Sequence, residues 1–366
     1  MTTIYIVSLE PVETRYTCQW FTGFPSLLNE EIKKRGLDSY KIEQINGDIL
    51  EDTGTTEGAF LNFAATNIWK SQQAIKVAEL FNNGKVCKGD KFIFTDFWNP
   101  TILQLRYMSD LLGIPVQIHS IVHAGSYDPQ DFLGRLITDK RWTYATEQAL
   151  FYASTYNYFA TEFHRDMFVD TVFADLSLDG LNGISEKIAL SGQPHNVLVE
   201  SLQPFAGMPK KKQILFPHRI APEKQVEIFR DLADYLPEAN FVVCQDRNLS
   251  KDEYHTLLGE SMIVFSANLQ ETLGISAMEG VLVGAVPFLP DRLSYSEMYH
   301  TEFLYPPEWT ESFESYLEHR EEIVDSIRKI MDGFDVYQEI LSKQKKILLD
   351  WYLHPSGMID RLFDDA

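Results

Sequence analysis

Apolar and polar residues alternate along the first half of the chain in a way that predicts strands and helices in turn. Short apolar runs, typical of buried strands, precede longer segments in which apolar residues recur every three or four positions, as on one face of a helix. The predicted strands cover residues 4–8, 40–45, 91–95, 116–122, 158–160 and 187–190, and the main predicted helices cover 26–35, 64–81, 101–112, 143–152 and 162–168. This alternation predicts a doubly wound parallel sheet of the α/β class.

The same pattern stops and restarts in the second half. Residues 191–212 contain prolines, glycines and a basic run, and we interpret them as a hinge. Beyond them the predicted strands cover 213–216, 240–243, 262–265 and 285–289, the helices cover 222–235, 251–258 and 272–283, and a segmented helical tail covers 311–362. We predict an N-terminal Rossmann-like domain (1–200), a C-terminal Rossmann-like domain (201–340) and a final helix (341–366) that packs back on the first domain. Two such domains would face each other across a ligand-binding cleft.

Composition narrows the class of protein. The chain has 366 residues, of which 45% are apolar and 13% aromatic, as expected for a well-packed globular enzyme. Its formal charge of −21 is spread over both halves, which disfavours tight nonspecific DNA binding, because that depends on Lys and Arg neutralising phosphates. Cys18, Cys87 and Cys244 lack the spacing of a zinc site or a disulfide framework. With no apolar run that could span a bilayer and no signal peptide, we expect a cytoplasmic protein without a membrane segment.

The stretch SMIVFSANLQETLGISAMEGVLVGAVPFLP, residues 261–290, carries the first functional signal. It predicts a buried strand, a loop, a helix with Gly274 in its first turn and Gly284 at its end, and a second buried strand. Backbone N–H groups at the start of a helix have no intrahelical acceptor, so an anion can bind there. Glu271 and Glu279 lie beside this anion site, which suits a ligand that also carries hydroxyl groups. A nucleotide-sugar meets both requirements.

Two cations follow the first strand of the same half. Arg219 and Lys224 lie just beyond residues 213–216, where a parallel strand presents its carboxyl end. Together with the helix N-terminus they form preset donors for the negative charge that a diphosphate leaving group gains in the transition state. Taken singly, each charged residue has an ordinary explanation as a helix cap or a solvated surface charge. Their joint order along the chain favours a binding site.

The passages FPHRIAPEKQVEIF, FVVCQ and SKDEYHTLLGESMIVFSANLQETLGISAMEGVLVGAVP resemble the nucleotide-sugar-binding domain of retaining glycosyltransferases with the GT-B fold and the Glu-x7-Glu motif. The resemblance implies donor-binding roles for the matching residues: Arg219, Lys224, Glu271, Gly274, Ile275 and Glu279. Arg219 and Lys224 would contact the diphosphate and help it leave. Glu271 would face the donor sugar, Glu279 the ribose hydroxyls. The implied activity is a retaining transfer from a nucleotide-sugar, which we expect to be UDP-linked, with no metal or other cofactor required.

The N-terminal domain resembles this family less closely. Many relatives carry a glycine pair after the first strand, whereas residues 8–25 read SLEPVETRYTCQWFTGFP and are predicted as a loop. We expect Arg15 to take over an anion contact, with Trp20 near the acceptor; the alternative is a surface loop held by a salt bridge. By resemblance, His123, after the strand VQIHSIV, hydrogen-bonds the donor sugar near the reacting carbon and is a catalytic candidate. The alternative is a structural histidine.

Further acceptor-side candidates follow two strands of this domain. Asp96 and Trp98 end the strand FIFTDFW, where Asp96 is a base, an acceptor anchor or a turn-forming residue. Asp128 lies in AGSYDPQDFLGR, a loop that we interpret as an acceptor-side lid. The sequence has no HExxH, Walker A or nucleophile-elbow motif, and we expect no metal site.

The motifs ETRYT and HAGSYDPQDFLGR resemble those of bacteriophage-encoded glycosyltransferases. This resemblance implies a hydroxymethylated pyrimidine in phage DNA as the acceptor, with the enzyme acting in the host cytoplasm. Such an acceptor needs a local basic groove, for which residues 33–35, 140–142 and 210–212 are candidates. The alternatives are a cell-envelope saccharide or a small metabolite as acceptor, a nucleotide-sugar epimerase, and a non-catalytic nucleotide-binding protein.

Overall fold

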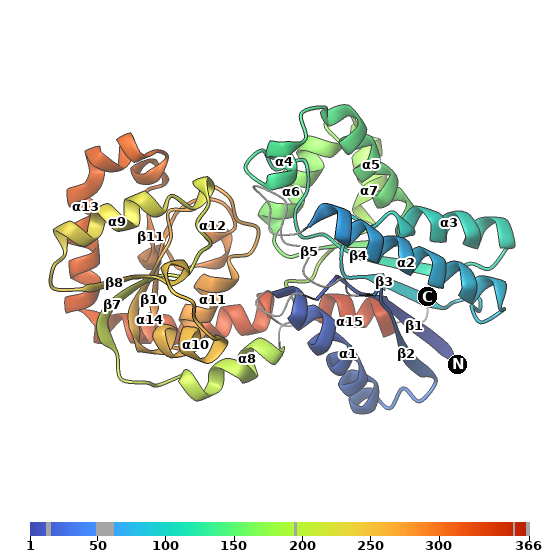
Figure 1. The fold of residues 1–366 in the computed structure, drawn as a ribbon, viewed down its shortest axis with the longest axis horizontal. Helices are drawn as coiled ribbons and strands as arrows, with labels where there is room; N and C mark the ends of the chain where they lie inside the picture. The colour runs from blue at the N-terminus through green and yellow to red at the C-terminus, as the bar shows by residue number, and fades with distance from the viewer. Residues whose placement is uncertain (12–15, 49–61, 194–195, 354–355, 364–366) are drawn as a thin grey trace. The chain divides into compact units, whose positions relative to one another are not determined.

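The computed structural model of the chain describes residues 1–11, 16–48, 62–193, 196–353 and 356–363. It divides into two compact units (Figure 1): unit 1 is Met1–His195 with Pro355–Ala366, and unit 2 is Asn196–His354. Each unit is built on a parallel sheet with helices packed against it, so the predicted doubly wound α/β class is confirmed. No helix in the described ranges is long and apolar enough to cross a lipid bilayer.

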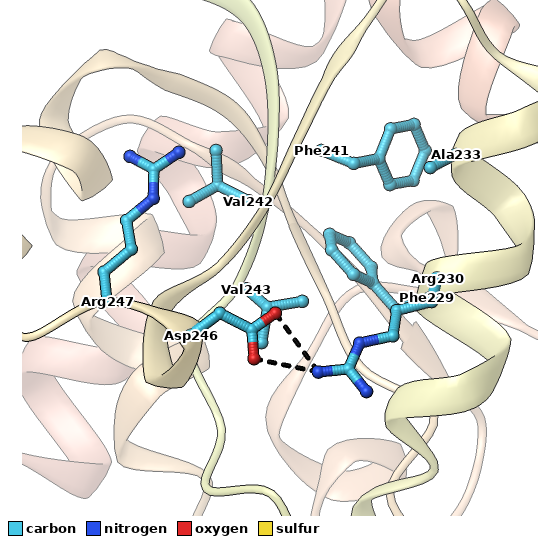
Figure 2. Close-up of a pocket in the computed structure, with 8 residues that line it drawn as sticks. All are labelled: Phe229, Arg230, Ala233, Phe241, Val242, Val243, Asp246 and Arg247. Atoms are coloured by element: carbon cyan, nitrogen blue, oxygen red, sulfur yellow. Dashed lines mark hydrogen bonds and ion pairs between the residues drawn. The ribbon is translucent and has the colours of Figure 1, made fainter.

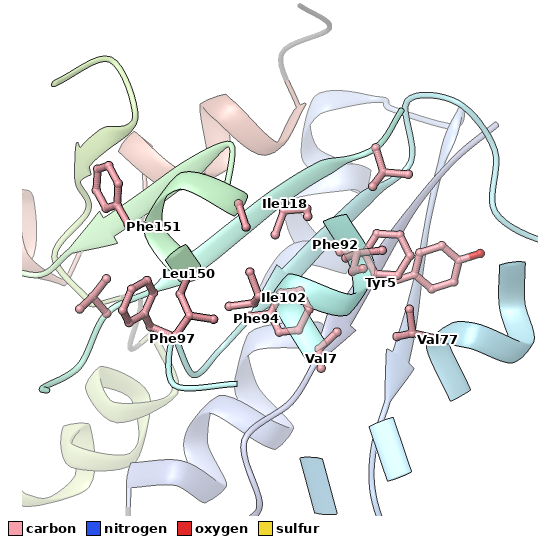
Figure 3. Packing of buried hydrophobic residues seen from close by; sticks show 14 of the residues in the cluster. Tyr5, Val7, Val77, Phe92, Phe94, Phe97, Ile102, Ile118, Leu150 and Phe151 are labelled. Carbon is pink, nitrogen blue, oxygen red and sulfur yellow. The ribbon is translucent and has the colours of Figure 1, made fainter. Parts of the chain in front are cut away.

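Unit 1 contains a six-stranded parallel sheet in the order β2-β1-β3-β4-β5-β6. Its strands are β1 (Thr2–Val7), β2 (Tyr40–Ile45), β3 (Lys91–Phe94), β4 (Gln117–Ile121), β5 (Tyr156–Phe159) and β6 (Ile188–Leu190). Side chains alternate between the two faces of each strand, which gives the unit two hydrophobic cores. Tyr5 and Val7 of β1 enter one core (Figure 3), whereas Ile4 and Ile6 enter the other.

The helices of unit 1 come from both ends of the chain. They are α1 (Tyr16–Arg35), α2 (Phe63–Asn82), α3 (Thr101–Leu112), α4 (Phe132–Leu136), α5 (Lys140–Ala153), α6 (Glu162–Val172), α7 (Leu178–Ser185) and α15 (Ser356–Phe363). Met358, Ile359 and Leu362 of α15 are buried in the same core as Ile4. Buried apolar residues on successive turns of α15 therefore hold the last helix on the sheet of unit 1.

Helix α1 begins well before its predicted start, so the prediction of a loop over residues 8–25 is wrong for the second half of that range. Trp20 is buried in the core and anchors this first part of the helix. Pro25 lies inside the helix and has no N–H to donate to the carbonyl oxygen of Phe21. The side chain of Gln44 compensates, since its Nε2 donates to that oxygen at 2.9 Å. The helix thus continues through a proline that the sequence pattern placed in a loop.

Unit 2 contains a five-stranded parallel sheet in the order β11-β10-β9-β7-β8. Its strands are β7 (Lys211–Phe216), β8 (Asn240–Val243), β9 (Ser261–Phe265), β10 (Val286–Pro290) and β11 (Leu304–Tyr305). Its helices are α8 (Asn196–Leu202), α9 (Val226–Tyr235), α10 (Lys251–Glu260), α11 (Ile275–Leu282), α12 (Tyr295–Met298), α13 (Phe313–Asp332) and α14 (Phe334–Ile347). Helix α8 lies inside the predicted hinge, which is therefore partly helical. Its Leu198 and Leu202 are buried, and they give it an apolar face that stabilises the helix.

Helix α11 is short and closely packed because of its glycines. It begins at Ile275, later than predicted, since Gly274 has φ +75° and forms the N-cap in a left-handed conformation. Gly284, with φ +87°, ends the helix as predicted. Gly280 faces β9 at a distance that leaves no room for a side chain. The helix therefore lies directly against the strand that leads into the predicted donor site.

Replacing Gly280 with alanine should destabilise unit 2. A Cβ at this position would lie 2.7 Å from Cγ2 of Val264, a fully buried side chain of β9. We expect this overpacking to lower the free energy of unfolding by about 1–3 kcal/mol, seen as a lower midpoint in urea. Gly183→Ala in α7 is the control, because a Cβ there meets no atom within 4 Å and alanine is the better helix former. Equal midpoints for Gly280→Ala and the wild type would contradict this packing.

Candidate active site

Two neighbouring strands of unit 2 bring the predicted donor-binding residues to one edge of the sheet. β7 and β9 run parallel, with Leu215 opposite Val264. The carboxyl ends of paired parallel strands lie at the same edge, where open α/β sheets bind ligands. The 3-10 turn Pro222–Lys224 follows β7, and the loop that leads to α11 follows β9. Lys224 in the turn after β7 and Glu271 in the loop after β9 therefore lie close together.

Lys224 is 6% exposed, and its ammonium group contacts the loop after β9. Nζ donates to the carbonyl oxygen of Gln270 at 2.5 Å and lies 3.4 Å from Oε2 of Glu271. A buried ammonium group is strongly unfavourable without such partners. The structure thus brings together Lys224 and Glu271, two residues that the sequence assigned to one donor site.

The Glu271 carboxylate receives donors from four groups: Lys224, Nδ2 of Asn268 at 3.3 Å, the backbone N–H of Thr272 at 3.2 Å and the backbone N–H of Gly274. Burial alone would raise its pKa. The positive charge of Lys224 and the hydrogen bond from the Gly274 N–H outweigh burial, and the pKa lies below its ordinary value. The carboxylate is therefore ionised at neutral pH, where it accepts hydrogen bonds and donates none.

Gly274 occupies a position that requires glycine. Its backbone is left-handed, and a Cβ would lie 2.7 Å from Cε1 of Tyr295. The N–H groups that open α11, including that of Ile275, have no acceptor within the helix. They form a positively polarised end that suits a phosphate group.

Arg219 pairs with Glu223, four residues further along the same turn. The arginine side chain is 33% exposed, whereas the glutamate side chain is fully buried. A guanidinium group has five N–H donors, so this ion pair leaves others for a phosphate. Arg219 is therefore oriented by Glu223 and keeps a partly exposed face.

Glu279 lies in the second turn of α11, beside a tyrosine of the preceding helix. It is 8% exposed, and the hydroxyl of Tyr254 donates to its Oε2 at 2.5 Å. Burial raises the pKa of Glu279 to about 7, and the hydrogen bond from Tyr254 opposes this rise only in part. The charge of this carboxyl group therefore changes within the physiological pH range.

Sequence reasoning missed His218, which lies between β7 and Arg219. The imidazole is 5% exposed, and its Nδ1 lies 3.3 Å from Oγ of Ser276 in the first turn of α11. Burial lowers its pKa to about 3, and the charge of Lys224 adds to this effect. The ring is neutral at neutral pH, so it offers a hydrogen bond and no charge at the helix N-terminus. Its place directly before Arg219 in the FPHR motif was the available signal.

His123 lies beyond the end of β4, at the carboxyl edge of the sheet in unit 1. Its Nε2 hydrogen-bonds the carbonyl oxygen of Thr95 at 2.8 Å, which places a proton on that nitrogen. Burial lowers the pKa of the ring, and the charge of Asp96 offsets this effect only in part. His123 is therefore a neutral imidazole with a fixed tautomer.

Asp96 takes part in an ion pair that the sequence did not predict. Its Oδ2 lies 2.6 Å from Nζ of Lys70 on α2, and its Oδ1 accepts the backbone N–H of Trp98 at 3.0 Å. The second contact is the turn-forming interaction that was one of three alternatives for Asp96. Lys70 also donates to the carbonyl oxygen of Trp98 at 2.6 Å. No spacing along the sequence links residue 70 to residue 96.

The two predicted tryptophans differ in exposure. Trp20 is 1% exposed, packed in the core with its ring 5.7 Å from that of His123, so it has no free face for a base to stack on. Trp98 is partly buried, and its Nε1 donates to Glu147 at 3.0 Å. Glu147 also accepts the N–H and hydroxyl of Ser126, and burial raises its pKa to about 7. Trp98 and Glu147 thus fix the loop after β4.

Asp128 organises a turn in the structure. Its carboxylate is buried and accepts the backbone N–H of Gln130 at 2.9 Å. The proposed lid is partly helical, because α4 begins at Phe132 with Asp131 as its N-cap. Arg15 lies outside the described residues.

A pocket of about 300 Å³ lies in unit 2 between α9 and β8 (Figure 2). Phe229 and Phe241 line it, and Arg230 at its rim contacts both carboxylate oxygens of Asp246, at 2.8 and 3.1 Å. None of the predicted donor-binding residues lines this pocket. Among the described residues, no group of three or more His, Cys, Asp or Glu side chains is arranged to hold a metal ion.

No family model and no curated protein sequence matches this chain. Its structure is similar to that of an α,α-trehalose-phosphate synthase (UDP-forming) from Burkholderia vietnamiensis, with a TM-score of 0.60 and 12% identity over 96% of each chain. It is also similar to the lipopolysaccharide outer core galactosyltransferase WaaB, with a TM-score of 0.54 and 11% identity over 99% of each chain. For Anabaena Alr3699/HepE in complex with UDP and glucose, the TM-score is 0.54 at 11% identity, over 96% of this chain and 95% of that chain. These likenesses establish the GT-B fold.

Proposed function

We propose that this protein is a glycosyltransferase that takes a sugar from a nucleotide-sugar, UDP-linked, and transfers it to a hydroxyl group with retention of configuration and without a required metal. The observation that carries the proposal is the buried Lys224–Glu271 pair, 3.4 Å apart, beside the N-terminus of α11. A cation and a helix N-terminus suit a diphosphate, and an ionised carboxylate suits a sugar hydroxyl. A simple nucleotide-binding protein has no need for a buried ionised carboxylate beside the phosphate cations.

The site residues divide the reaction between leaving group and sugar. Lys224, Arg219 and the first N–H groups of α11 stabilise the diphosphate as its bond to the sugar breaks. Glu271 accepts a hydrogen bond from a hydroxyl of the donor sugar, and Glu279 accepts hydrogen bonds from the ribose hydroxyls. His123 of unit 1, a neutral imidazole, stays a catalytic candidate through the family resemblance alone. The acceptor hydroxyl forms the new bond to the sugar and gives its proton to the departing phosphate oxygen.

The acceptor is the less constrained half of the reaction. The basic segments considered for DNA binding make contacts within the protein: Nζ of Lys210 donates to the carbonyl oxygens of Gly259 and Val283, and Arg35 pairs with Asp360. Lys140 likewise donates to backbone carbonyl groups. These contacts leave fewer cations for DNA phosphates and favour a saccharide or small-metabolite hydroxyl over a hydroxymethylated pyrimidine in phage DNA.

The test has two stages. A thermal-shift screen with nucleotides and nucleotide-sugars identifies the donor, since a ligand of the native state raises its stability by about 2.7 kcal/mol at a hundredfold excess over Kd. The donor is then incubated with saccharides, small polyols and hydroxymethylcytosine-containing DNA, and the anomeric configuration of the product is read by NMR. A product with inverted configuration would refute retention. Interconversion of the donor without transfer would identify an epimerase. Donor binding without transfer to any of these acceptors would refute the proposed glycosyltransferase activity.

Donor binding should depend on pH through Glu279. An ionised carboxylate is a better acceptor for ribose hydroxyls than a protonated one. Because the pKa of Glu279 is about 7, we expect affinity for the nucleotide-sugar to fall as pH drops below 7, by at most about tenfold per pH unit. Neighbouring Tyr254 and Cys244 have raised pKa values and do not titrate there. Calorimetry across the neutral range checks this; a flat profile in the wild type would contradict it.

The raised pKa of Glu279 also makes the stability of the fold depend on pH. As pH rises, stability falls, whereas donor affinity rises. The carboxyl group of Glu279 has a higher pKa in the folded chain than its ordinary 4.5, so the stability that it contributes is present at low pH and lost as pH rises through about 7. Glu279→Gln removes this loss. The variant should therefore unfold at a higher temperature than the wild type above pH 7 and show a pH-independent donor affinity.

A further inference from the structure

We infer that Arg292 and Gln225 are positioning residues of the donor site, which together set the relative placement of Lys224 and Glu271. This inference rests on the function proposed above, and it names two residues to which the sequence analysis assigned no role. We call the two side chains, with the carbonyl groups of Ala267 and Thr310 that both of them contact, the carbonyl clamp.

Arg292 follows β10 and directs its guanidinium group at backbone oxygens. Nε donates to Asn268 at 2.8 Å, Nη1 donates to Pro307 at 2.9 Å, and Nη2 donates to Ala267 at 2.9 Å. Nη2 also contacts the carbonyl oxygen and the hydroxyl of Thr310, each at 3.1 Å. All three guanidinium nitrogens thus bond to oxygens of two segments, the loop after β9 and the 3-10 helix Pro307–Thr310 after β11.

Gln225 reaches two of the same acceptors from another direction. It is 3% exposed, and its Nε2 donates to the carbonyl oxygens of Ala267 and Thr310, each at 2.7 Å. A carbonyl oxygen has two lone pairs and so accepts from both side chains at once. Removing either donor would leave a buried carbonyl group with a poorer set of partners.

The backbone at the clamp is held in an unfavourable conformation. Among the described residues, Gln225 and Leu293 are the non-glycine residues with positive φ, at 52° and 60°. One is a clamp residue, and the other directly follows Arg292. Left-handed backbone is costly for residues with a Cβ, and it persists where the surroundings determine it and often where function requires it. The positive φ values are an observation separate from the hydrogen bonds. They place backbone strain at Gln225 and next to Arg292, the two residues of the clamp.

The position of the clamp explains what it holds. Gln225 directly follows Lys224, so its side chain ties the segment that carries the ammonium group to the loop that carries the carboxylate. On that loop, Arg292 and Gln225 fix Ala267, and Arg292 fixes Asn268, whose Nδ2 donates to Glu271 at 3.3 Å. The clamp therefore restrains both ends of the Lys224–Glu271 pair without touching either charged group.

Substitutions with methionine test this role. In Arg292→Met and Gln225→Met we expect kcat to fall about 100-fold, because misplacement by about 1 Å has that effect on a positioned group. Affinity for UDP should fall much less than kcat, since Glu279 and the N-terminus of α11 make no clamp contact and keep their places. The double variant should lose little more than either single variant, because both residues hold the same carbonyl groups. Arg292→Lys, which keeps a donor, should recover part of kcat.

Hydrogen exchange provides a readout that does not require activity. The amide of Leu269, which donates to the carbonyl oxygen of Glu223 at 2.8 Å, should exchange faster in both methionine variants, while the strands of unit 2 keep their protection. Arg320→Met is the control, since this arginine pairs with Asp231 at 3.3 Å and makes no clamp contact. Wild-type kcat together with unchanged exchange at Leu269 in both methionine variants, measured below their melting temperatures, would overturn the positioning role. If the wild type transfers no sugar, the proposed function fails, and exchange alone decides the clamp.

Discussion

Lys224→Ala should lower kcat for sugar transfer by about 100- to 1,000-fold, the range found when one preset donor to a developing negative charge is removed. Lys224 is the most buried of the proposed phosphate-binding cations, and water has little access to replace it. Its ammonium group also lowers the pKa of Glu271, so its loss weakens the neighbouring carboxylate as an ionised acceptor. Steady-state kinetics with the donor identified by thermal shift measure the effect.

Stability must be separated from catalysis in this variant. Lys224→Ala leaves the Glu271 carboxylate without its nearest cation, which is expected to destabilise unit 2. Kinetics are therefore measured well below the melting temperature, and Lys343→Ala serves as the control, because Lys343 is exposed and pairs with the exposed Glu339 at 3.1 Å. Wild-type turnover in a folded Lys224→Ala protein would refute the site.

Glu271→Gln should lower kcat by roughly 2- to 30-fold while leaving the shape of the site intact. The amide keeps the size of the side chain but loses the charge that Lys224 and the Gly274 N–H surround. A hydrogen bond to a charged acceptor is worth roughly 1.5–3 kcal/mol, against about 1 for a neutral one. Transfer assays and UDP binding measured on the same protein separate a loss in turnover from a loss in affinity.

Two further measurements sharpen this prediction. Lys224→Ala with Glu271→Gln should lose much less than the product of the single effects, since the groups act as a pair. The pKa of Glu271 is lowered in the folded chain, so its stabilising effect is present above its ordinary pKa and is lost on acidification. Glu271→Gln should lack this acid-dependent loss. Additive kinetic effects would show that the two residues serve separate steps.

The fold was readable from the sequence because its signals are local. Apolar runs gave the strands, and the alternation with helices gave the parallel sheets. The start of α1 was not readable, because it depends on Gln44 supplying a donor in place of the missing N–H of Pro25. Helix α8 was hidden in a segment whose prolines and glycines suggested a hinge. In both cases a tertiary contact overrode a local signal.

The candidate site was readable only where its residues follow strands in a fixed order. Lys224 and Glu271 could be assigned together because a motif and the ends of two strands mark both. Arg292 and Lys70 carry no such mark, since each bonds to partners whose distance along the chain has no periodic meaning. The burial of Trp20 could not be predicted either. The sequence pattern around an aromatic residue near a predicted loop does not distinguish a side chain in the core from one that contacts a ligand.

The return of α15 to the sheet of unit 1 sets an order of events during synthesis. The chain leaves unit 1 after residue 195 and returns to it only at residue 355, so the whole of unit 2 is made before the first unit receives its last helix. Until then the core that buries Met358 and Phe363 stays uncovered on one side. The second unit can therefore finish folding first, against the usual order in which N-terminal domains lead. Proteolysis of ribosome-stalled chains that stop short of α15 would show unit 2 protected and unit 1 still sensitive.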